Sequence, residues 1–109
     1  MKKKIVITPI GPKLVKNKLF LFLKSKYEYK FIGGISNNQK KILNFLQNAH
    51  AAIIGSEKIN NSTLIKLKYI KIIVRFGGGL PDVDKYLAKK MGIKLYEVKT
   101  TRVSNEVSL

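Results

Sequence analysis

Short apolar runs alternate along the chain with stretches in which apolar residues recur three and four positions apart. The runs are rich in β-branched and aromatic residues and predict strands at residues 3–8, 27–32, 51–54, 70–74 and 93–98. The stretches between them predict helices. The apolar residues that recur at helical spacing in these stretches are Leu14, Leu19, Phe20 and Leu23; Ile42, Phe45 and Leu46; Leu64, Ile65 and Leu67; and Val83, Tyr86, Leu87, Ala88 and Met91. Those at positions 42, 45 and 46 are expected to face the core.

This alternation predicts the fold class. Strands that are apolar on both faces, joined by connections of a few residues, favour a parallel sheet, because right-handed crossovers bring consecutive strands side by side. We expect an α/β fold, a flavodoxin-like three-layer sandwich whose five-stranded parallel sheet has the order 2-1-3-4-5. Residues 1–109 would form a single domain. In such sheets ligands lie at the carboxyl ends of the strands.

The helix predicted after the fourth strand has signals at both ends. Asp82 can cap its first N–H groups and Asp84 suits the positive end of the helix dipole. Lys89 and Lys90 suit the negative end, and Gly92 can adopt the left-handed conformation that ends many helices.

The turn before this helix is the best candidate site. Gly77, Gly78 and Gly79 have no side chains to cover backbone N–H groups, and the start of a helix would add partial positive charge there. A small carboxylate or phosphate would suit such a turn. Three glycines can also serve only to make a tight turn with positive φ angles, and geometry alone favours that plainer interpretation.

The composition excludes several classes of protein. No apolar stretch approaches the roughly 18 residues that span a bilayer, and the apolar stretch after the lysines at positions 2–4 is too short for a signal peptide. We therefore expect a cytoplasmic protein. The absence of cysteine and the presence of one histidine argue against a metal site.

The net charge of +16 raises the question of a nucleic-acid partner. Lysine supplies 20 of the 22 basic residues, whereas base and phosphate recognition favours the bidentate fork of arginine. The lysines are also spread from Lys2 to Lys99 and form no single block. A solvated basic surface is therefore the favoured interpretation, and a nucleic-acid partner is not expected.

Most other polar and aromatic residues of interest have a structural explanation that does not require a site. His50 is best explained as a helix-terminal or surface histidine, and Asp82 and Asp84 as helix caps instead of acid/base groups. Arg75 suits an anionic ligand and a surface or domain contact equally well. The alternation of Tyr27, Tyr29 and Phe31 is similar to an RNA-stacking platform, but half-buried strand side chains explain it better.

Residues 73–84 read Ile-Val-Arg-Phe-Gly-Gly-Gly-Leu-Pro-Asp-Val-Asp and resemble a motif of the D-isomer-specific 2-hydroxyacid dehydrogenases, the family of D-3-phosphoglycerate dehydrogenase. That motif is an apolar strand, Arg, any residue, Gly-Val-Gly, any residue and Asp-Asn-Ile-Asp. Residues 88–95, Ala-Lys-Lys-Met-Gly-Ile-Lys-Leu, are similar to the family's Ala-x-x-x-Gly-Ile-x-Val. Weaker likenesses lie at residues 6–9, 51–59 and 105–108, so the resemblance spans nearly the whole chain.

The resemblance implies a substrate site. In the family the amides of the Gly-Val-Gly turn hold the substrate carboxylate, and the loop after the third strand touches the rest of the substrate. These roles would fall on Gly78 and Gly79, with Gly77 and Arg75 beside them, and on Ser56, Glu57 and Lys58. Two departures lie at the mouth of this site: Pro81 and Asp82 replace Asp-Asn, and the family's Asn-Thr-Pro-Gly is not recognisable at residues 97–100.

The resemblance also implies what these residues lack. The family binds NAD with a Gly-x-Gly-x-x-Gly turn in a second, Rossmann domain, which also carries its catalytic Arg, Glu and His. The glycine turn here is no substitute, since aspartate stands at the last position of that spacing. We expect the chain to end at the hinge before that domain, to contain no catalytic, cofactor-binding or metal-binding residues, and to be inactive alone.

The hypothesis is therefore the substrate-binding part of an NAD-dependent 2-hydroxyacid dehydrogenase. Its expected partners are a small 2-hydroxy or 2-oxo carboxylate and a full-length dehydrogenase or separate NAD-binding chain. Two alternatives stay open. One is a small basic nucleic-acid-binding protein, and the other is a regulatory remnant that pairs with a full-length dehydrogenase.

Overall fold

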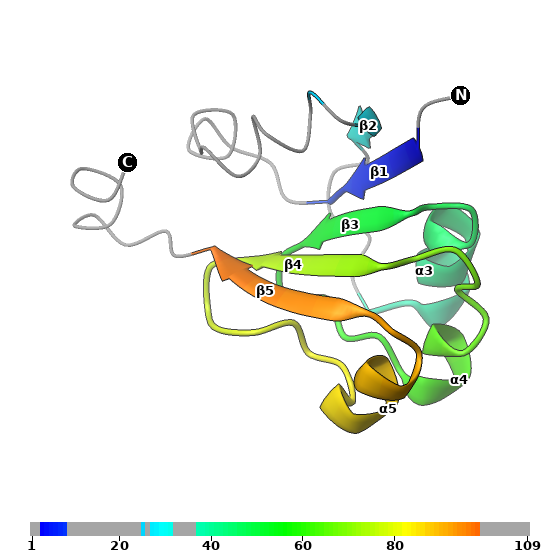
Figure 1. Cartoon of the computed structure of the whole chain (residues 1–109), viewed down its shortest axis with the longest axis vertical. Helices are drawn as coiled ribbons and strands as arrows, with labels where there is room; N and C mark the ends of the chain where they lie inside the picture. The colour runs from blue at the N-terminus through cyan, green and yellow to red at the C-terminus, as the bar shows by residue number, and fades with distance from the viewer. Residues whose placement is uncertain (1–2, 9–24, 26, 32–36, 99–109) are drawn as a thin grey trace.

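The computed structural model describes residues 3–8, 25, 27–31 and 37–98. Five parallel strands form one sheet in the order β2-β1-β3-β4-β5 (Figure 1). The strands are β1 (Lys3–Ile7), β2 (Tyr27–Phe31), β3 (Ala51–Ile54), β4 (Ile72–Phe76) and β5 (Lys94–Val98). The predicted α/β class, the parallel pairing and the strand order are confirmed.

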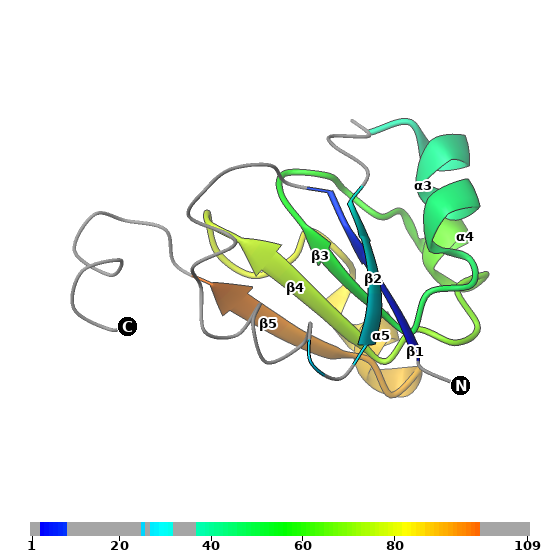
Figure 2. The same ribbon diagram turned by 90° about the horizontal axis from the view of Figure 1, so that it is seen from above.

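The described helices are α3 (Gln39–Leu46), α4 (Asn61–Leu64) and α5 (Lys85–Lys90). They cover one face of the sheet, as the view along its edge shows (Figure 2). On that face Val6, Ala52 and Ile73 from the strands pack with Ile42 and Leu46 from α3. The predicted helix containing Leu14 and Leu23, and with it the third layer of the sandwich, lies outside the described residues.

The opposite face of the sheet has its own buried cluster. It consists of the strand residues Ile5, Ile7, Ala51, Ile53, Val74 and Val98. Because successive side chains of a strand point to opposite faces, Ile5 and Ile7 join this cluster while Val6 joins the helical side. The apolar character of β1 and β3 on both faces, read from the sequence as a sign of a covered parallel sheet, agrees with this division.

The boundaries of two elements differ from the sequence prediction. Strand β4 begins at Ile72 and runs to Phe76, two residues later than predicted, because Arg75 and Phe76 pair with Glu97 and Val98 of β5. Ile70 is buried in the connection before the strand. Ile65 and Tyr86 belong to the predicted helical patterns, but they are 57% and 73% exposed. Helix α4 is a single turn that ends at Leu64, before Ile65.

Helix α3 begins with a side-chain cap. Asn38 is the N-cap, and its Oδ1 accepts a hydrogen bond from the Lys41 N–H at 3.2 Å. The Gln39 side chain then ties this end of the helix to the loop after β3. Its Nε2 donates to the Lys58 carbonyl at 2.8 Å, and its Oε1 accepts from the Thr63 hydroxyl at 2.7 Å. This cross-link fixes the position of a loop at the carboxyl edge of the sheet.

Candidate functional site at the carboxyl edge of the sheet

The glycine turn leaves the end of β4 directly. Gly77, Gly78 and Gly79 have φ angles of 85°, 78° and 105°, which side chains of L-residues rarely tolerate. Gly78 is exposed and its neighbours are half-buried. The turn therefore needs glycine at all three positions for conformational reasons, whatever it binds.

The three amides of the turn are not equivalent. The Gly77 N–H donates to the Val98 carbonyl at 2.6 Å, which continues the pairing of β4 with β5. Within the described part of the chain, neither the Gly78 nor the Gly79 N–H has a hydrogen-bond acceptor. The amides able to receive an anion are thus those of Gly78 and Gly79, while that of Gly77 is engaged.

Arg75 lies against the turn. A Cβ added at Gly78 would stand 2.8 Å from Nη2 of Arg75, so the guanidinium occupies the space beside that glycine. Nη1 approaches the Leu80 carbonyl at 3.5 Å, which is long for a hydrogen bond. Nε is buried and has no partner. A permanent positive charge therefore lies beside Gly78, and one of its donors, Nε–H, is buried without an acceptor.

The unpartnered donor matters because buried polar groups are nearly always hydrogen-bonded. Among the described residues two buried side-chain atoms lack a partner, Arg75 Nε and Thr8 Oγ1. Both residues lie at carboxyl ends of strands, β4 and β1. This edge is where ligands of parallel α/β sheets bind.

The helix after the turn does not contribute as predicted. Helix α5 begins at Lys85, so residues 80–84 separate it from the last glycine. The influence of a helix dipole fades within the first turn, and the predicted helix contribution to the anion site is therefore wrong. The predicted cap at Asp82 is also wrong, because the N-cap is Asp84.

Both carboxylate oxygens of Asp84 accept hydrogen bonds from nearby residues. Its Oδ1 accepts from the Leu87 N–H at 3.0 Å and its Oδ2 accepts from Asn61 Nδ2 at 3.1 Å. These hydrogen bonds, the one from Leu87 first, lower the pKa of Asp84 below its ordinary value. The carboxylate thus pins α5 to the start of α4 and is not available for acid/base chemistry.

The loops after β3 and β4 are joined. Lys58 and Asp82 form a parallel β-bridge, and the Ile59 N–H donates to the Asp82 carbonyl at 3.1 Å. The bridge places the loop of Ser56, Glu57 and Lys58 beside the connection that follows the glycine turn. The loop follows β3, and the strand order of the sheet reverses between β1 and β3. Ligands of such folds usually bind at the point of this reversal.

The three predicted residues of the loop after β3 differ in their availability. Ser56 and Lys58 are exposed. Glu57 is 7% exposed, and its Oε1 accepts from the Gly55 N–H at 2.7 Å. The carboxylate of Glu57 is thus used to close its own loop, which leaves Ser56 and Lys58 as the side chains free to meet a ligand.

Sequence reasoning missed the residues that hold this edge together. Asn37 Oδ1 accepts from the Lys58 N–H at 2.8 Å, and Gln39 Oε1 accepts from the Asn60 N–H at 3.1 Å. Polar residues at a helix start indicate capping, but nothing in their spacing indicates bonds to a loop about twenty residues away.

The described residues of this edge offer neither a cluster of metal-ligand side chains nor a glycine turn that opens directly into a helix. Within the described ranges no group of three or more His, Cys, Asp or Glu side chains is placed to hold a metal. The pyrophosphate of NAD binds where a glycine turn opens directly into a helix, and here residues 80–84 intervene.

The fold and this edge define an open, parallel α/β domain with its glycine turn after the fourth strand. Residues 5–105 match the model of the D-isomer specific 2-hydroxyacid dehydrogenase catalytic domain. The chain belongs to this family, and the resemblance read from residues 73–84 is confirmed. A search of the curated proteins found no match.

Solved structures agree on the fold. The NAD-bound 3-phosphoglycerate dehydrogenase of Entamoeba histolytica is 24% identical, with a TM-score of 0.68 over 85% of this chain and 32% of that one. A phosphoglycerate oxidoreductase of Vibrio cholerae is 17% identical, with a TM-score of 0.69 over 95% and 33%. The pyruvate reductase of Chlamydomonas reinhardtii is 14% identical, with a TM-score of 0.61 over 91% and 29%. The chain therefore spans about a third of the length of these neighbours.

Proposed function

We propose that the chain is the substrate-binding part of an NAD-dependent 2-hydroxyacid dehydrogenase, and that it binds the carboxylate of a small 2-hydroxy or 2-oxo acid. The observation that carries the proposal is the pair of free amides at Gly78 and Gly79 beside the Arg75 guanidinium. Family membership supports it further. A cytoplasmic location is part of the same proposal.

The chemistry of the turn suits a carboxylate. Two N–H donors and a guanidinium can share the two oxygens, and hydrogen bonds to a charged acceptor are about twice as strong as neutral ones. Ser56 and Lys58, on the loop bridged to Asp82, are the side chains proposed to meet the rest of the acid. Their role is binding and orientation, with no proton transfer assigned to either.

Hydride transfer needs a cofactor, and the described residues offer no place for one. We therefore assign NAD and the catalytic Arg, Glu and His to an NAD-binding domain that acts together with this one. Alone, the chain is expected to oxidise no NADH in the presence of pyruvate or hydroxypyruvate. Turnover by the purified chain would contradict this division of labour.

Binding is tested by saturation-transfer difference NMR with D-lactate and its amide, lactamide. D-lactate gives a signal at millimolar concentration. Excess acetate reduces this signal more than excess chloride does. Lactamide, which has the same carbon skeleton without the charge, gives none. Equal signals from both compounds, or none from either, would overturn the proposed carboxylate site.

A further inference from the structure

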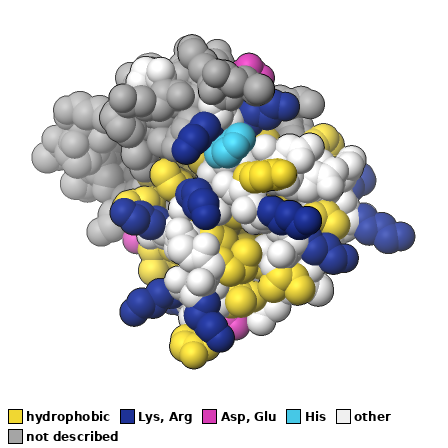
Figure 3. Space-filling view, turned by 45° about the vertical axis from the view of Figure 1, so that its right-hand side comes forward, with side chains coloured by type: hydrophobic (Ala, Val, Ile, Leu, Met, Phe, Trp, Pro, Cys, Tyr) yellow, Lys and Arg dark blue, Asp and Glu magenta, His cyan; other side chains and the backbone are white. Residues whose placement is uncertain are grey.

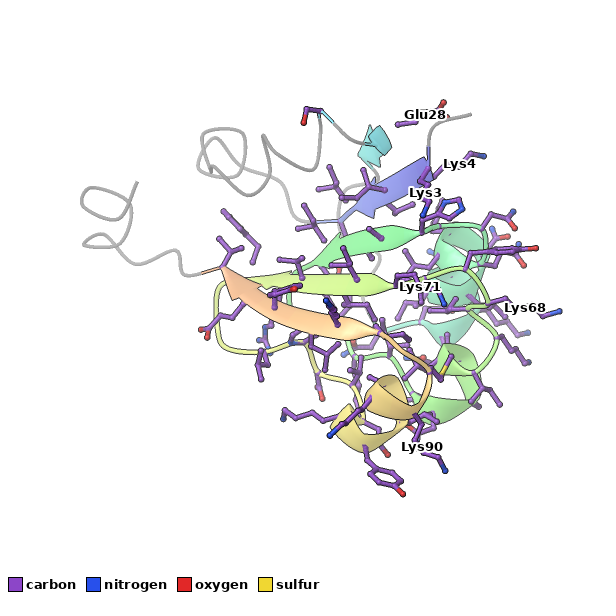
Figure 4. The ribbon with its side chains drawn as sticks, in the orientation of Figure 1. Lys3, Lys4, Glu28, Lys68, Lys71 and Lys90 are labelled. Atoms are coloured by element: carbon purple, nitrogen blue, oxygen red, sulfur yellow. The ribbon has the colours of Figure 1, made fainter. Side chains whose placement is uncertain are left out.

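The structure brings together lysines that are far apart in the sequence. The His50 N–H donates to the Lys4 carbonyl, the Lys71 N–H to the His50 carbonyl, and the Lys94 N–H to the Lys71 carbonyl, each at 2.8 Å. These residues lie at or just before the starts of β1, β3, β4 and β5. They form a continuous row across the amino edge of the sheet, at the end opposite the glycine turn. Figure 4 labels Lys4 and Lys71 of this row.

More lysines surround this row. Lys3 precedes Lys4, Lys66 and Lys68 lie in the connection from α4 to β4, and Lys89 and Lys90 end α5. All of these lysines, with Lys4, Lys71 and Lys94, are exposed. Basic side chains accordingly encircle the histidine in the space-filling view (Figure 3). We call this surface the basic end: Lys3, Lys4, His50, Lys66, Lys68, Tyr69, Lys71, Lys89, Lys90 and Lys94.

Acidic residues are distributed in the opposite way. Five acids lie in the described part of the chain, and Glu28 on β2 is the one near the basic end. Glu57, Asp82 and Asp84 lie in loops at the carboxyl edge, and Glu97 lies near the carboxyl end of β5. Four of the five described acids therefore lie away from the basic end, where few acids offset the lysines.

Two aromatic rings lie within the basic end. The rings of His50 and Tyr69 are 6.0 Å apart with their planes tilted by 40°. His50 Nδ1 accepts from the Lys4 N–H at 3.0 Å, which fixes the imidazole in the row. Tyr69 is 51% exposed. A tyrosine held beside a fixed ring and surrounded by cations offers a stacking surface for a nucleobase.

We propose that the basic end binds the phosphate backbone of a single-stranded nucleic acid, with a base stacked on Tyr69. Lysines interact with phosphates as point charges, which supplies affinity without reading sequence. A membrane surface fits less well, because Ile65 is the one bulky aliphatic side chain that the described residues expose in this region. An acidic protein fits less well, because protein interfaces are depleted in lysine and the basic end contains eight exposed lysines.

In the sequence the lysines are spread along the chain. A parallel sheet brings the starts of all its strands to one edge, and eight exposed lysines that are dispersed along the chain gather there. The inference is independent of the proposed carboxylate site, which lies at the other edge. If the test of the carboxylate site fails, the nucleic-acid proposal is unaffected, and the reverse also holds.

The test measures binding of a fluorescein-labelled, mixed-sequence single-stranded oligonucleotide by anisotropy, between about 50 and 200 mM salt. The variant Lys68→Gln/Lys71→Gln/Lys94→Gln removes three charges from the basic end. Its affinity falls about tenfold or more at low salt. The slope of log K against log[salt] becomes less steep by about 2, because each phosphate contact with a single strand contributes roughly 0.7 to it. Tyr69→Phe binds normally, whereas Tyr69→Ala weakens single-strand binding.

The matched control is Lys40→Gln/Lys41→Gln/Lys85→Gln, which removes three exposed lysines at the starts of α3 and α5. Its affinity changes less than about twofold. Equal losses in the two triple variants would show that net charge alone binds the oligonucleotide and would overturn the proposal. Tighter binding to polyglutamate or to anionic phospholipid vesicles than to the oligonucleotide would also overturn it. Circular dichroism spectra confirm that each variant is folded.

Discussion

Arg75 and Gly78 form the residue-level unit on which the candidate site depends. The glycine lets the backbone turn at a φ of 78°, and its missing Cβ leaves room for the guanidinium. Both residues were site candidates from the sequence. A glycine triplet after an apolar run indicates a turn, and Arg75 suits an anionic ligand beside it. It could not show that Gly77 donates to Val98, since that bond depends on which strand pairs with β4.

The packing of Arg75 on Gly78 predicts coupled substitutions. Gly78→Ala and Gly79→Ala each lower the free energy of unfolding by about 1–2 kcal/mol, because alanine is strained at positive φ. Gly78→Ala adds a small further cost of about 0.5 kcal/mol, because its Cβ would meet Arg75 Nη2 at 2.8 Å and the flexible guanidinium must move, whereas no atom lies within 4 Å of a Cβ at Gly79.

Urea denaturation of single and double variants checks this coupling. In an Arg75→Ala background the extra cost of Gly78→Ala disappears, while the cost of Gly79→Ala stays unchanged. Identical costs of Gly78→Ala in both backgrounds would show that the guanidinium does not pack on the turn.

At the scale of elements, the order of strands and helices follows from hydrophobic periodicity, whereas the loops do not. β1 and β3 could be placed because their apolar residues are continuous. The ends of β4 were misplaced because Arg75 and Phe76 are in the strand through pairing with β5, which local composition does not reveal. The start of α5 was misplaced because Asp82 and Asp84 are equally good caps in sequence.

The cap of α5 predicts a pH-dependent stability. Hydrogen bonds to its carboxylate lower the pKa of Asp84 from 3.8, so Asp84 stabilises the fold above that pH and the stabilisation is lost as pH falls through the lowered value. Asp84→Ala therefore lowers the Tm by several degrees at pH 7. The difference from the parent chain shrinks below pH 3.8.

Thermal unfolding followed by circular dichroism at several pH values measures this effect. Asp82→Ala is the matched control, because its carboxylate makes no recorded hydrogen bond in the described structure and its Tm changes little. A larger effect of Asp82→Ala than of Asp84→Ala would contradict the assignment of the cap.

For the whole molecule, the sheet separates two surfaces of different character. The carboxyl edge holds the glycine turn, the bridged loops and most described acids, and the amino edge holds the basic end. Periodicity predicted the sheet that creates both edges. It could not predict the basic end, because that surface depends on which residues the crossovers bring to each edge. Within the described residues, no helix is long and apolar enough to cross a membrane.

The central claim is that the Gly78 and Gly79 amides receive a carboxylate, and a residue-resolved NMR titration tests it most directly. In ¹H–¹⁵N spectra of the labelled chain, D-lactate is expected to shift the Gly78 and Gly79 amides and the Arg75 Nε signal in a saturable way. The Gly77 amide, bonded to Val98, moves less, and lactamide moves none of them. Saturable shifts confined to other residues, or no shift at 76–80, would contradict the account.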